Sequence, residues 1–139
     1  SLLMLDLDHF KQINDGCGHL GGDEALREVA ARIESQVRAS DTAARFGGDE
    51  FAVLMPGAGP AEAHRLAERI RAAVSHSPVE AGPGVSLRIS VSVGLASLLP
   101  PQGRTDLKAL AERLLAEADA ALYRAKAAGR DRIEGSGEV

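Results

Sequence analysis

The order of the hydrophobic patterns in the sequence predicts an α+β domain with a ferredoxin-like arrangement, in which helices pack on one central sheet. Three segments, 23–38, 61–74 and 106–127, have apolar residues at helical spacing. Short apolar runs typical of strands accompany them, and residues 87–95 show the cleanest period-two alternation. With 139 residues, 45% of them hydrophobic, the chain can bury one core without disulfides or a metal.

The first half of the chain is expected to form a strand, two helices and a hairpin. An apolar run at residues 1–5 predicts a buried strand that leads into two aspartates. A short helix is expected next, broken near residues 14–16 by an Asn-Asp-Gly sequence. The helix over 23–38 follows. Two short strands, 42–46 and 51–55, then flank a Gly-Gly-Asp-Glu tip, which is a hairpin pattern.

The second half is expected to continue with the helix over 61–74, a loop, a strand and a long helix. Residues 76–84 are rich in Pro and Gly and predict the loop before the alternating strand. The last helix should end near Gly129, because glycine suits the residue that follows a helix. A short final strand can follow at residues 132–133.

Composition limits the kinds of function that the chain can have. The net charge is −4, with three Phe, one Tyr and no Trp, so we expect no nucleic-acid binding. No apolar run is long enough to cross a membrane and no signal peptide leads the chain, so we expect no membrane contact by this domain. The single cysteine fits a reducing, cytoplasmic location. We expect one domain over residues 1–134 and a flexible tail over 135–139.

Acidic residues are expected to meet at one end of the sheet. Asp6 and Asp8 lie two apart at the end of the first strand, so their side chains point the same way. The hairpin tip can bring Asp49 close to Asp6 if the two strands are neighbours. Two carboxylates at a sheet end suit a hard divalent ion, and Mg²⁺ leaves positions for phosphate oxygens. The alternative is that each acid only solvates a loop.

The two glycines of the tip, Gly47 and Gly48, allow a ligand to approach the backbone closely, because they have no side chain. The alternative is an ordinary tight turn. Directly followed by Asp49, Glu50 and an apolar strand, the pair becomes a more specific pattern.

Four segments resemble, in order, the motifs of the GGDEF family of diguanylate cyclase domains. Residues 47–51 are identical to the Gly-Gly-Asp-Glu-Phe signature, and residues 6–15 match the D-x-D-x-F-K-x-x-N-D segment. The pairs at 18–19 and 22–23 match the G-H and G-D pairs that follow, and residues 123–130 resemble the closing Y-x-A-K-x-x-G-R. Chance does not explain four spaced motifs in this order.

The resemblance implies a domain that joins two GTP molecules into cyclic di-GMP with release of pyrophosphate. It implies a nucleotidyl-cyclase palm-type fold whose antiparallel-rich sheet carries the signature on a β-hairpin. It further implies Mg²⁺ or Mn²⁺, held by Asp6, Asp49 and the backbone carbonyl of Leu7. Glu50 would be a further metal ligand or would help to deprotonate the attacking 3′-hydroxyl.

The resemblance also assigns residues to the GTP site. Asn14 and Asp23 would bind the guanine edge, and the backbone of the two signature glycines would lie against the nucleotide. The phosphate side would be lined by Phe10, Lys11, Lys126 and Arg130.

The residues by themselves leave other roles open for five of these positions. Lys126 and Arg130 can complement the dipole at the end of the last helix. Asp23 can be a first-turn acid of a helix. Asn14 can be a turn residue, and Phe10 is as suited to the core as to a ligand wall.

Arg38 and Asp41 form an R-x-x-D pattern at the spacing of the family's inhibitory product site, and Arg69 resembles a third contributor. Arg can clamp phosphate and stack on guanine, and Asp can accept hydrogen bonds from the guanine edge. The alternative is charge decoration at a helix end. We expect cyclic di-GMP to bind here and to hold domains in an unproductive arrangement.

Two expectations concern partners. Each domain should bind one GTP and the product has two-fold symmetry, so a homodimer is the expected competent species. The chain lacks the L-T-x-L-x-N-R segment usual upstream in the family, so we expect an input or sensor domain that is absent here. The alternatives are a catalytically inactive module that binds GTP or cyclic di-GMP, and a cyclase with altered base preference.

Overall fold

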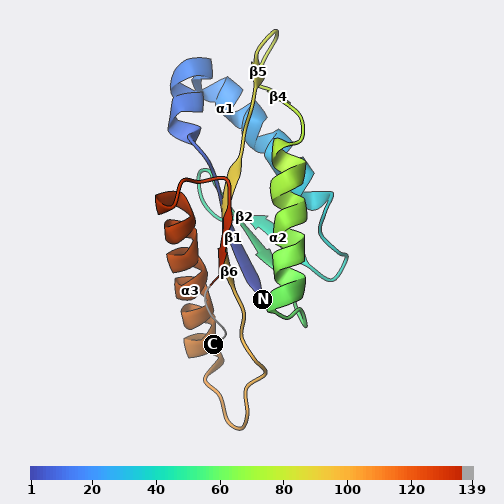
Figure 1. The fold of residues 1–139 in the computed structure, drawn as a ribbon, viewed down its shortest axis with the longest axis vertical. Coiled ribbons are helices and arrows are strands. Elements are labelled where there is room, and N and C mark those ends of the chain that lie inside the picture. The colour runs from blue at the N-terminus through green and yellow to red at the C-terminus, as the bar shows by residue number, and fades with distance from the viewer. Residues whose placement is uncertain (136–139) are drawn as a thin grey trace.

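The structure, a computed structural model, describes residues 1–135 and has an α+β fold (Figure 1). In chain order the elements are β1 (Leu2–Leu7), α1 (Phe10–Glu34), β2 (Thr42–Arg45), β3 (Glu50–Leu54), α2 (Pro60–Ser75), β4 (Val79–Glu80), β5 (Ser86–Leu87), β6 (Val91–Ala96), α3 (Leu107–Ala127) and β7 (Ile133–Gly135). A five-stranded sheet has the order β2-β3-β1-β6-β7, and β4 pairs with β5 separately. Only the β6–β7 pair of the large sheet is parallel, so the predicted antiparallel-rich α+β fold is confirmed.

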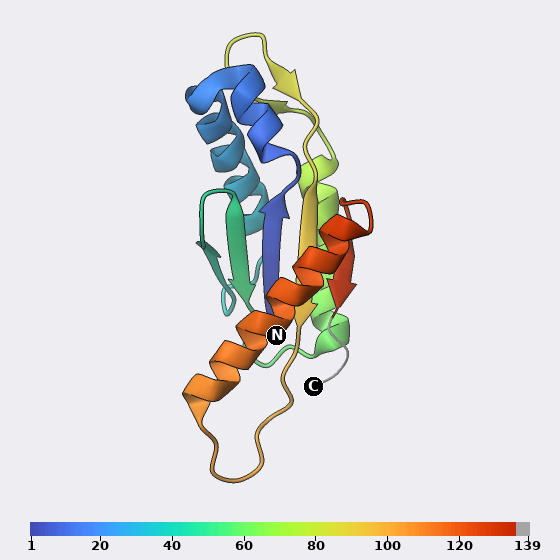
Figure 2. The ribbon, with the colours of Figure 1, turned by 90° about the vertical axis from the view of Figure 1, so that its left-hand side faces the viewer.

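Helices cover both faces of the sheet (Figure 2). On one face Leu3, Leu5 and Leu7 of β1 pack in a large apolar cluster with α1 and α2. On the other face Leu2 and Met4 pack against α3. The alternation of side chains along a strand therefore turns Asp6 toward α3, like Leu2 and Met4.

Strand β6 is buried along its whole length because it lies between α2 and α3. Val91, Val93 and Leu95 belong to the large cluster, so Ser92 and Gly94 lie on the α3 face. A Cβ at Gly94 would lie 2.1 Å from the carbonyl oxygen of Ala118 in α3. The alternation along β6 thus separates two buried faces. One face is apolar, and the other carries small residues that let the backbone of α3 come close.

The predicted break in the first helix was misplaced. The helix starts at Phe10 and continues through residues 14–16 to a kink at Gly18, where φ is 71° and ψ is 174°. That left-handed φ favours glycine. Asp23 therefore lies well inside α1 rather than in a first turn, and the helix ends at Glu34 instead of continuing to Arg38.

The strand predicted over 87–95 is divided into two. Leu7, the last residue of β1, pairs with Val91, and the last backbone contact beyond it is the hydrogen bond from the N–H of Asp8 to the carbonyl oxygen of Ser90 at 2.9 Å. Ser86 and Leu87 pair instead with β4, which lies inside the segment predicted as a loop. Gly135, assigned to the tail, is the last residue of β7, and residues 136–139 lie outside the described residues.

The long helix α3 follows its predicted bounds closely. The side chain of Asp106 accepts hydrogen bonds from the backbone N–H groups of Lys108 (3.0 Å) and Ala109 (3.2 Å), which caps the helix. At the other end Gly129 has a φ of 125° and follows the last helical turn, as predicted. This helix brings its C-terminal end to Asp6 and Asp8 at the end of β1.

Candidate active site

A cavity of about 200 Å³ lies where β1 and the hairpin tip meet the end of α3. Seven residues predicted for the metal and GTP sites line it: Asp6, Leu7, Phe10, Lys11, Asp49, Lys126 and Arg130. The other lining residues are Asp8, His9 and Gln12. We call this space the Asp6 cavity. It brings together the sheet end, the start of α1 and the end of α3, which are far apart in the sequence.

The register of the sheet explains why the acids meet. Asp6 pairs with Glu50 of β3 on one side and with Ser92 of β6 on the other. The backbone N–H of Leu7 donates a hydrogen bond to the carbonyl oxygen of Asp49 at 3.2 Å. The hairpin tip is therefore held against the end of β1.

The carboxylate of Asp6 is 6% exposed, and its two oxygens differ. Oδ2 forms an ion pair with Nζ of Lys126, whereas Oδ1 is buried without a hydrogen-bond partner in residues 1–135. Burial lowers the pKa of Lys126, and the positive charge of Arg130 lowers it further. A buried carboxylate oxygen without a donor is a site that a cation would satisfy.

Glu50 also has an unfavourable environment for its charge. Burial raises its pKa, and the carboxylates of Asp119 and Asp49 raise it further. Within residues 1–135 no cluster of three or more His, Cys, Asp or Glu side chains forms a complete metal cage. An ion that takes one or two protein carboxylates, as Mg²⁺ does, fits this donor set better than zinc does.

The tip glycines are not required by the backbone, since neither has a left-handed φ. A Cβ at Gly47 would lie 3.2 Å from Oε2 of Glu50, whereas a Cβ at Gly48 would meet no protein atom within 4 Å. Neither glycine lines the Asp6 cavity. Because the chain itself has room for a side chain at Gly48, the open backbone there remains available to a ligand.

Arg45 is a residue that the sequence reasoning missed. Its Nε donates to the carbonyl oxygens of Gly47 (3.3 Å) and Gly48 (3.0 Å), and its Nη2 donates to Gly48 at 2.6 Å. The guanidinium thus fixes the shape of the tip. The only signal in the sequence is its place two residues before the signature.

The two residues predicted for guanine lie on α1. The Oδ1 atom of Asn14 lies 1.9 Å from the position that a Cβ would take at Gly22, next to Asp23. Asn14 is therefore helical and packed rather than a turn residue. Phe10 packs against the core, lines the Asp6 cavity and places its Cζ atom 3.4 Å from the same Gly22 position.

Asp23 does not line the Asp6 cavity. It lines a separate cavity of about 340 Å³ between α1 and the hairpin, together with Leu26, Arg45 and Phe51 among others. Phe10 and Asn14 both approach Gly22, the residue before Asp23.

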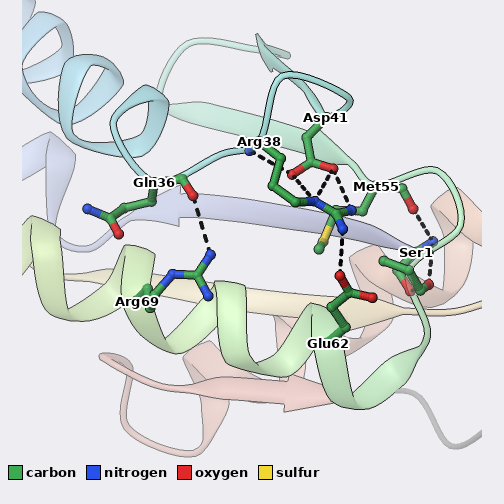
Figure 3. A network of polar contacts seen from close by, with 8 residues as sticks. Ser1, Gln36, Arg38, Asp41, Met55, Glu62 and Arg69 are labelled. Atoms are coloured by element: carbon green, nitrogen blue, oxygen red, sulfur yellow. Dashed lines mark hydrogen bonds and ion pairs between the residues drawn. The ribbon is translucent and has the colours of Figure 1, made fainter.

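The residues predicted for the product site gather on the surface near the end of α1 and on α2 (Figure 3). Arg38 binds Asp41 through its backbone N–H (2.9 Å) and through Nη2 (2.9 Å). Its Nη1 contacts Glu62 of α2 at 2.5 Å, a partner that the sequence reasoning missed. Arg69 donates to the carbonyl oxygen of Gln36 at 3.4 Å. The hydrogen bonds from Arg38 lower the pKa of Asp41, and the charge of Arg69 adds to this effect.

Comparison with known proteins decides the family. The family model for the diguanylate cyclase GGDEF domain matches residues 1–132. The chain belongs to the GGDEF domain family. This GGDEF domain is 46% identical over 136 residues to the response regulator PleD of Caulobacter vibrioides, covering 97% of the chain and 29% of PleD. It is 43% identical over 134 residues to the diguanylate cyclase DosC of Escherichia coli, covering 96% of the chain and 28% of DosC.

Solved structures agree with this assignment. The GGDEF domain of DgcB from Caulobacter crescentus, in complex with c-di-GMP, matches with a TM-score of 0.82 and 34% identity, covering 96% of this chain and 75% of that one.

The present chain spans less than a third of the length of PleD and DosC. That an input domain precedes it stays a prediction. None of the helices in residues 1–135 is both long and apolar enough to span a membrane.

Proposed function

We propose that this GGDEF domain is a diguanylate cyclase that condenses two GTP into cyclic di-GMP and releases pyrophosphate. The observation that carries the proposal is the Asp6 cavity, where an unpartnered carboxylate oxygen and Asp49 face Lys126 and Arg130. Phosphoryl transfer needs positioning and charge neutralisation more than covalent help from the protein, and this cavity supplies both kinds of group.

Asp6, Asp49 and the carbonyl of Leu7 would hold Mg²⁺ or Mn²⁺, with Glu50 as a further ligand. The ion supplies charge neutralisation and makes the attacking 3′-hydroxyl easier to deprotonate. The unpartnered oxygen of Asp6 and the raised pKa of Glu50 support this assignment, because a cation would relieve both. In the alternative role, Glu50 would help to deprotonate the 3′-hydroxyl.

Lys126 leaves Asp6 for the triphosphate in this proposal. Its ammonium is paired with Asp6 in the free domain, so an ion at Asp6 would free it. Arg130 and Lys11 line the same cavity and neutralise further phosphate oxygens. Phe10 would separate the phosphates from the base.

Asn14 and Asp23 would read the guanine edge, Asp23 as an acceptor for N–H donors and Asn14 as donor and acceptor. The backbone of Gly47 and Gly48, shaped by Arg45, would lie against the nucleotide. Because the product joins two identical halves, two domains face each other in a homodimer, each with one GTP.

Turnover by a concentrated or artificially dimerised sample with GTP and Mg²⁺ tests the proposal. We expect cyclic di-GMP and pyrophosphate, and we expect Asp49→Ala to lower the rate by at least about 100-fold, since it removes a metal ligand. A matched control, Asp15→Asn on the exposed side of α1, should keep the wild-type rate. GTP binding without any product would favour the inactive binding module.

We also propose that cyclic di-GMP inhibits through Arg38, Asp41 and Arg69. Their arrangement on one surface and the c-di-GMP complex of the DgcB GGDEF domain support this. Titration of Arg38→Ala with cyclic di-GMP should show weakened binding and lost inhibition. Unchanged binding and inhibition would refute the site.

A further inference from the structure

Asp8 is a buried carboxylate that the proposed chemistry does not use. It is 5% exposed and lines the Asp6 cavity beside the metal-binding end of β1. Its Oδ1 accepts a hydrogen bond from Ser92 Oγ at 2.7 Å. Its Oδ2 accepts from Ser90 Oγ at 2.6 Å and from the backbone N–H of Asp131 at 3.0 Å. Both oxygens are thus satisfied within the protein, in contrast to Asp6, which argues against Asp8 as a metal ligand.

The third donor belongs to the loop that carries Arg130. Arg130 and Asp131 have positive φ values, 66° and 45°, although neither is glycine. A left-handed conformation is unfavourable for a residue with a side chain, so this loop needs contacts that hold it. Asp8 supplies one through the N–H of Asp131, and Arg71 of α2 supplies another at 3.0 Å to the Asp131 side chain.

We infer that Asp8 is a positioning residue for the triphosphate, because it holds the Arg130 loop at a set distance from the metal-binding end of β1. The inference rests on the proposed function and deepens it. Asp8 directly follows Leu7, so one short segment supplies the carbonyl for the metal and the anchor for the phosphate-binding arginine. The two serines keep the carboxylate of Asp8 aimed at the loop.

Binding measurements on Asp8→Ala test the inference without turnover. We expect the affinity for GTP to fall about tenfold, the loss typical of a charge-assisted contact, while the affinity for GMP stays close to wild type. The effect should vanish when Arg130 is already alanine, so the double variant Asp8→Ala with Arg130→Ala should bind GTP like Arg130→Ala alone. Hydrogen exchange of the Asp131 amide should accelerate.

Two variants guard against a purely structural effect. Asp106→Ala removes the cap at the other end of α3, so it should lower stability but leave the GTP-to-GMP affinity ratio unchanged. Asp8→Asn keeps the size of the side chain and offers one acceptor oxygen in place of two. The amide removes the negative charge that strengthens the hydrogen bond from the Asp131 N–H, so a loss of about threefold in GTP affinity is expected. If Asp8→Ala does not fold, the GTP affinity of Asp8→Asn tests the inference instead.

Equal losses for GTP and GMP, additive effects with Arg130→Ala, or wild-type GTP affinity in both Asp8 variants would overturn the inference. If the wild-type domain does not bind GTP at all, the proposed function fails separately. The hydrogen exchange of the Asp131 amide then tests the role of Asp8 by itself. An unchanged exchange rate in the Asp8 variants refutes the anchor, and a faster rate supports it.

Discussion

Single residues in this domain are held in competing pairings that a ligand would rearrange. Lys126 neutralises Asp6 in the free domain, yet both would have other partners when metal and GTP bind. At the proposed product site the donors of Arg38 are likewise already occupied, by Asp41 and Glu62. The affinity of each site for its ligand therefore depends also on the ion pairs within the protein that binding must break.

Glu62 should weaken the binding of cyclic di-GMP, because its carboxylate competes with the phosphate for Nη1 of Arg38. We expect Glu62→Gln to raise the affinity for cyclic di-GMP about threefold, the size of effect typical of an exposed charge pair. The difference from wild type should shrink at high ionic strength, because salt screens exposed charges. Calorimetric titration measures this. Glu68→Gln, on the same helix but paired with Arg71, is the control and should bind like wild type. Equal or weaker binding by Glu62→Gln would contradict the competition.

Asp41 should make stability depend on pH in the acid range. Arg38 lowers the pKa of Asp41 in the folded state, so the carboxylate stabilises the fold above its ordinary pKa of 3.8. This contribution is lost as the pH falls through the lowered pKa. We expect Asp41→Asn to unfold at lower urea than wild type near pH 7, and the difference to shrink in acid. Asp15→Asn should show no such trend, and a constant difference for Asp41→Asn would count against the prediction.

At the scale of elements, α1 carries the residues proposed to bind the base, and α3 leads to the cations proposed to bind the phosphates. Each depends on an approach that excludes a side chain: Gly22 leaves room for Asn14, and Gly94 leaves room for the backbone of α3. Glycine in a helix interior costs up to about 1 kcal/mol relative to alanine. At Gly22 this cost in stability is tolerated because the side chain of Asn14 packs against the helix backbone where a Cβ would otherwise lie.

Gly22→Ala should therefore separate stability from binding. The added Cβ would overlap Oδ1 of Asn14 and displace the amide, so we expect GTP affinity and the preference for GTP over ATP to fall about tenfold. Helix propensity offsets part of the lost packing, so thermal unfolding should change little. Gly16→Ala in the same helix meets no atom within 4 Å and is the matched control. Wild-type binding by Gly22→Ala would remove Asn14 from the base site.

At the scale of the whole molecule, the proposed reaction needs two copies of this domain. The sheet brings the acids, the phosphate-binding cations and the hairpin to one edge, but a symmetric product needs a second such edge. Mixing wild type with an equal amount of Asp49→Ala tests this. Random pairing leaves roughly a quarter of the dimers with two intact halves, so the rate of cyclic product should fall to about a quarter.

The control for that mixture is Glu112→Gln, an exposed change near the start of α3, which should leave the rate of the mixture unchanged. All rates are compared at the same total protein concentration. A fall to half, in proportion to the wild-type content, would show that each domain completes the reaction alone and would end the dimer proposal.

Local patterns in the sequence were sufficient for the fold class and for most of the Asp6 cavity. Helical and period-two spacing report which faces are buried, so α2, α3 and the hairpin strands came out near their observed bounds. The residues by themselves linked Asp6 with Asp49, and the resemblance to the family motifs added Lys126 and Arg130 to them. The break at residues 14–16 was wrong, because helix continuity there is set by neighbouring packing as well as by local propensity.

The tertiary structure alone decided which groups are partners. Asp8 with Asp131, Arg38 with Glu62 and Arg45 with the tip carbonyls are pairings fixed by register, loop paths and side-chain direction. The division of residues 87–95 was decided in the same way, by where β1 ends. Periodicity in a sequence records burial one residue at a time, whereas these contacts depend on the distance between segments that only the folded chain brings together.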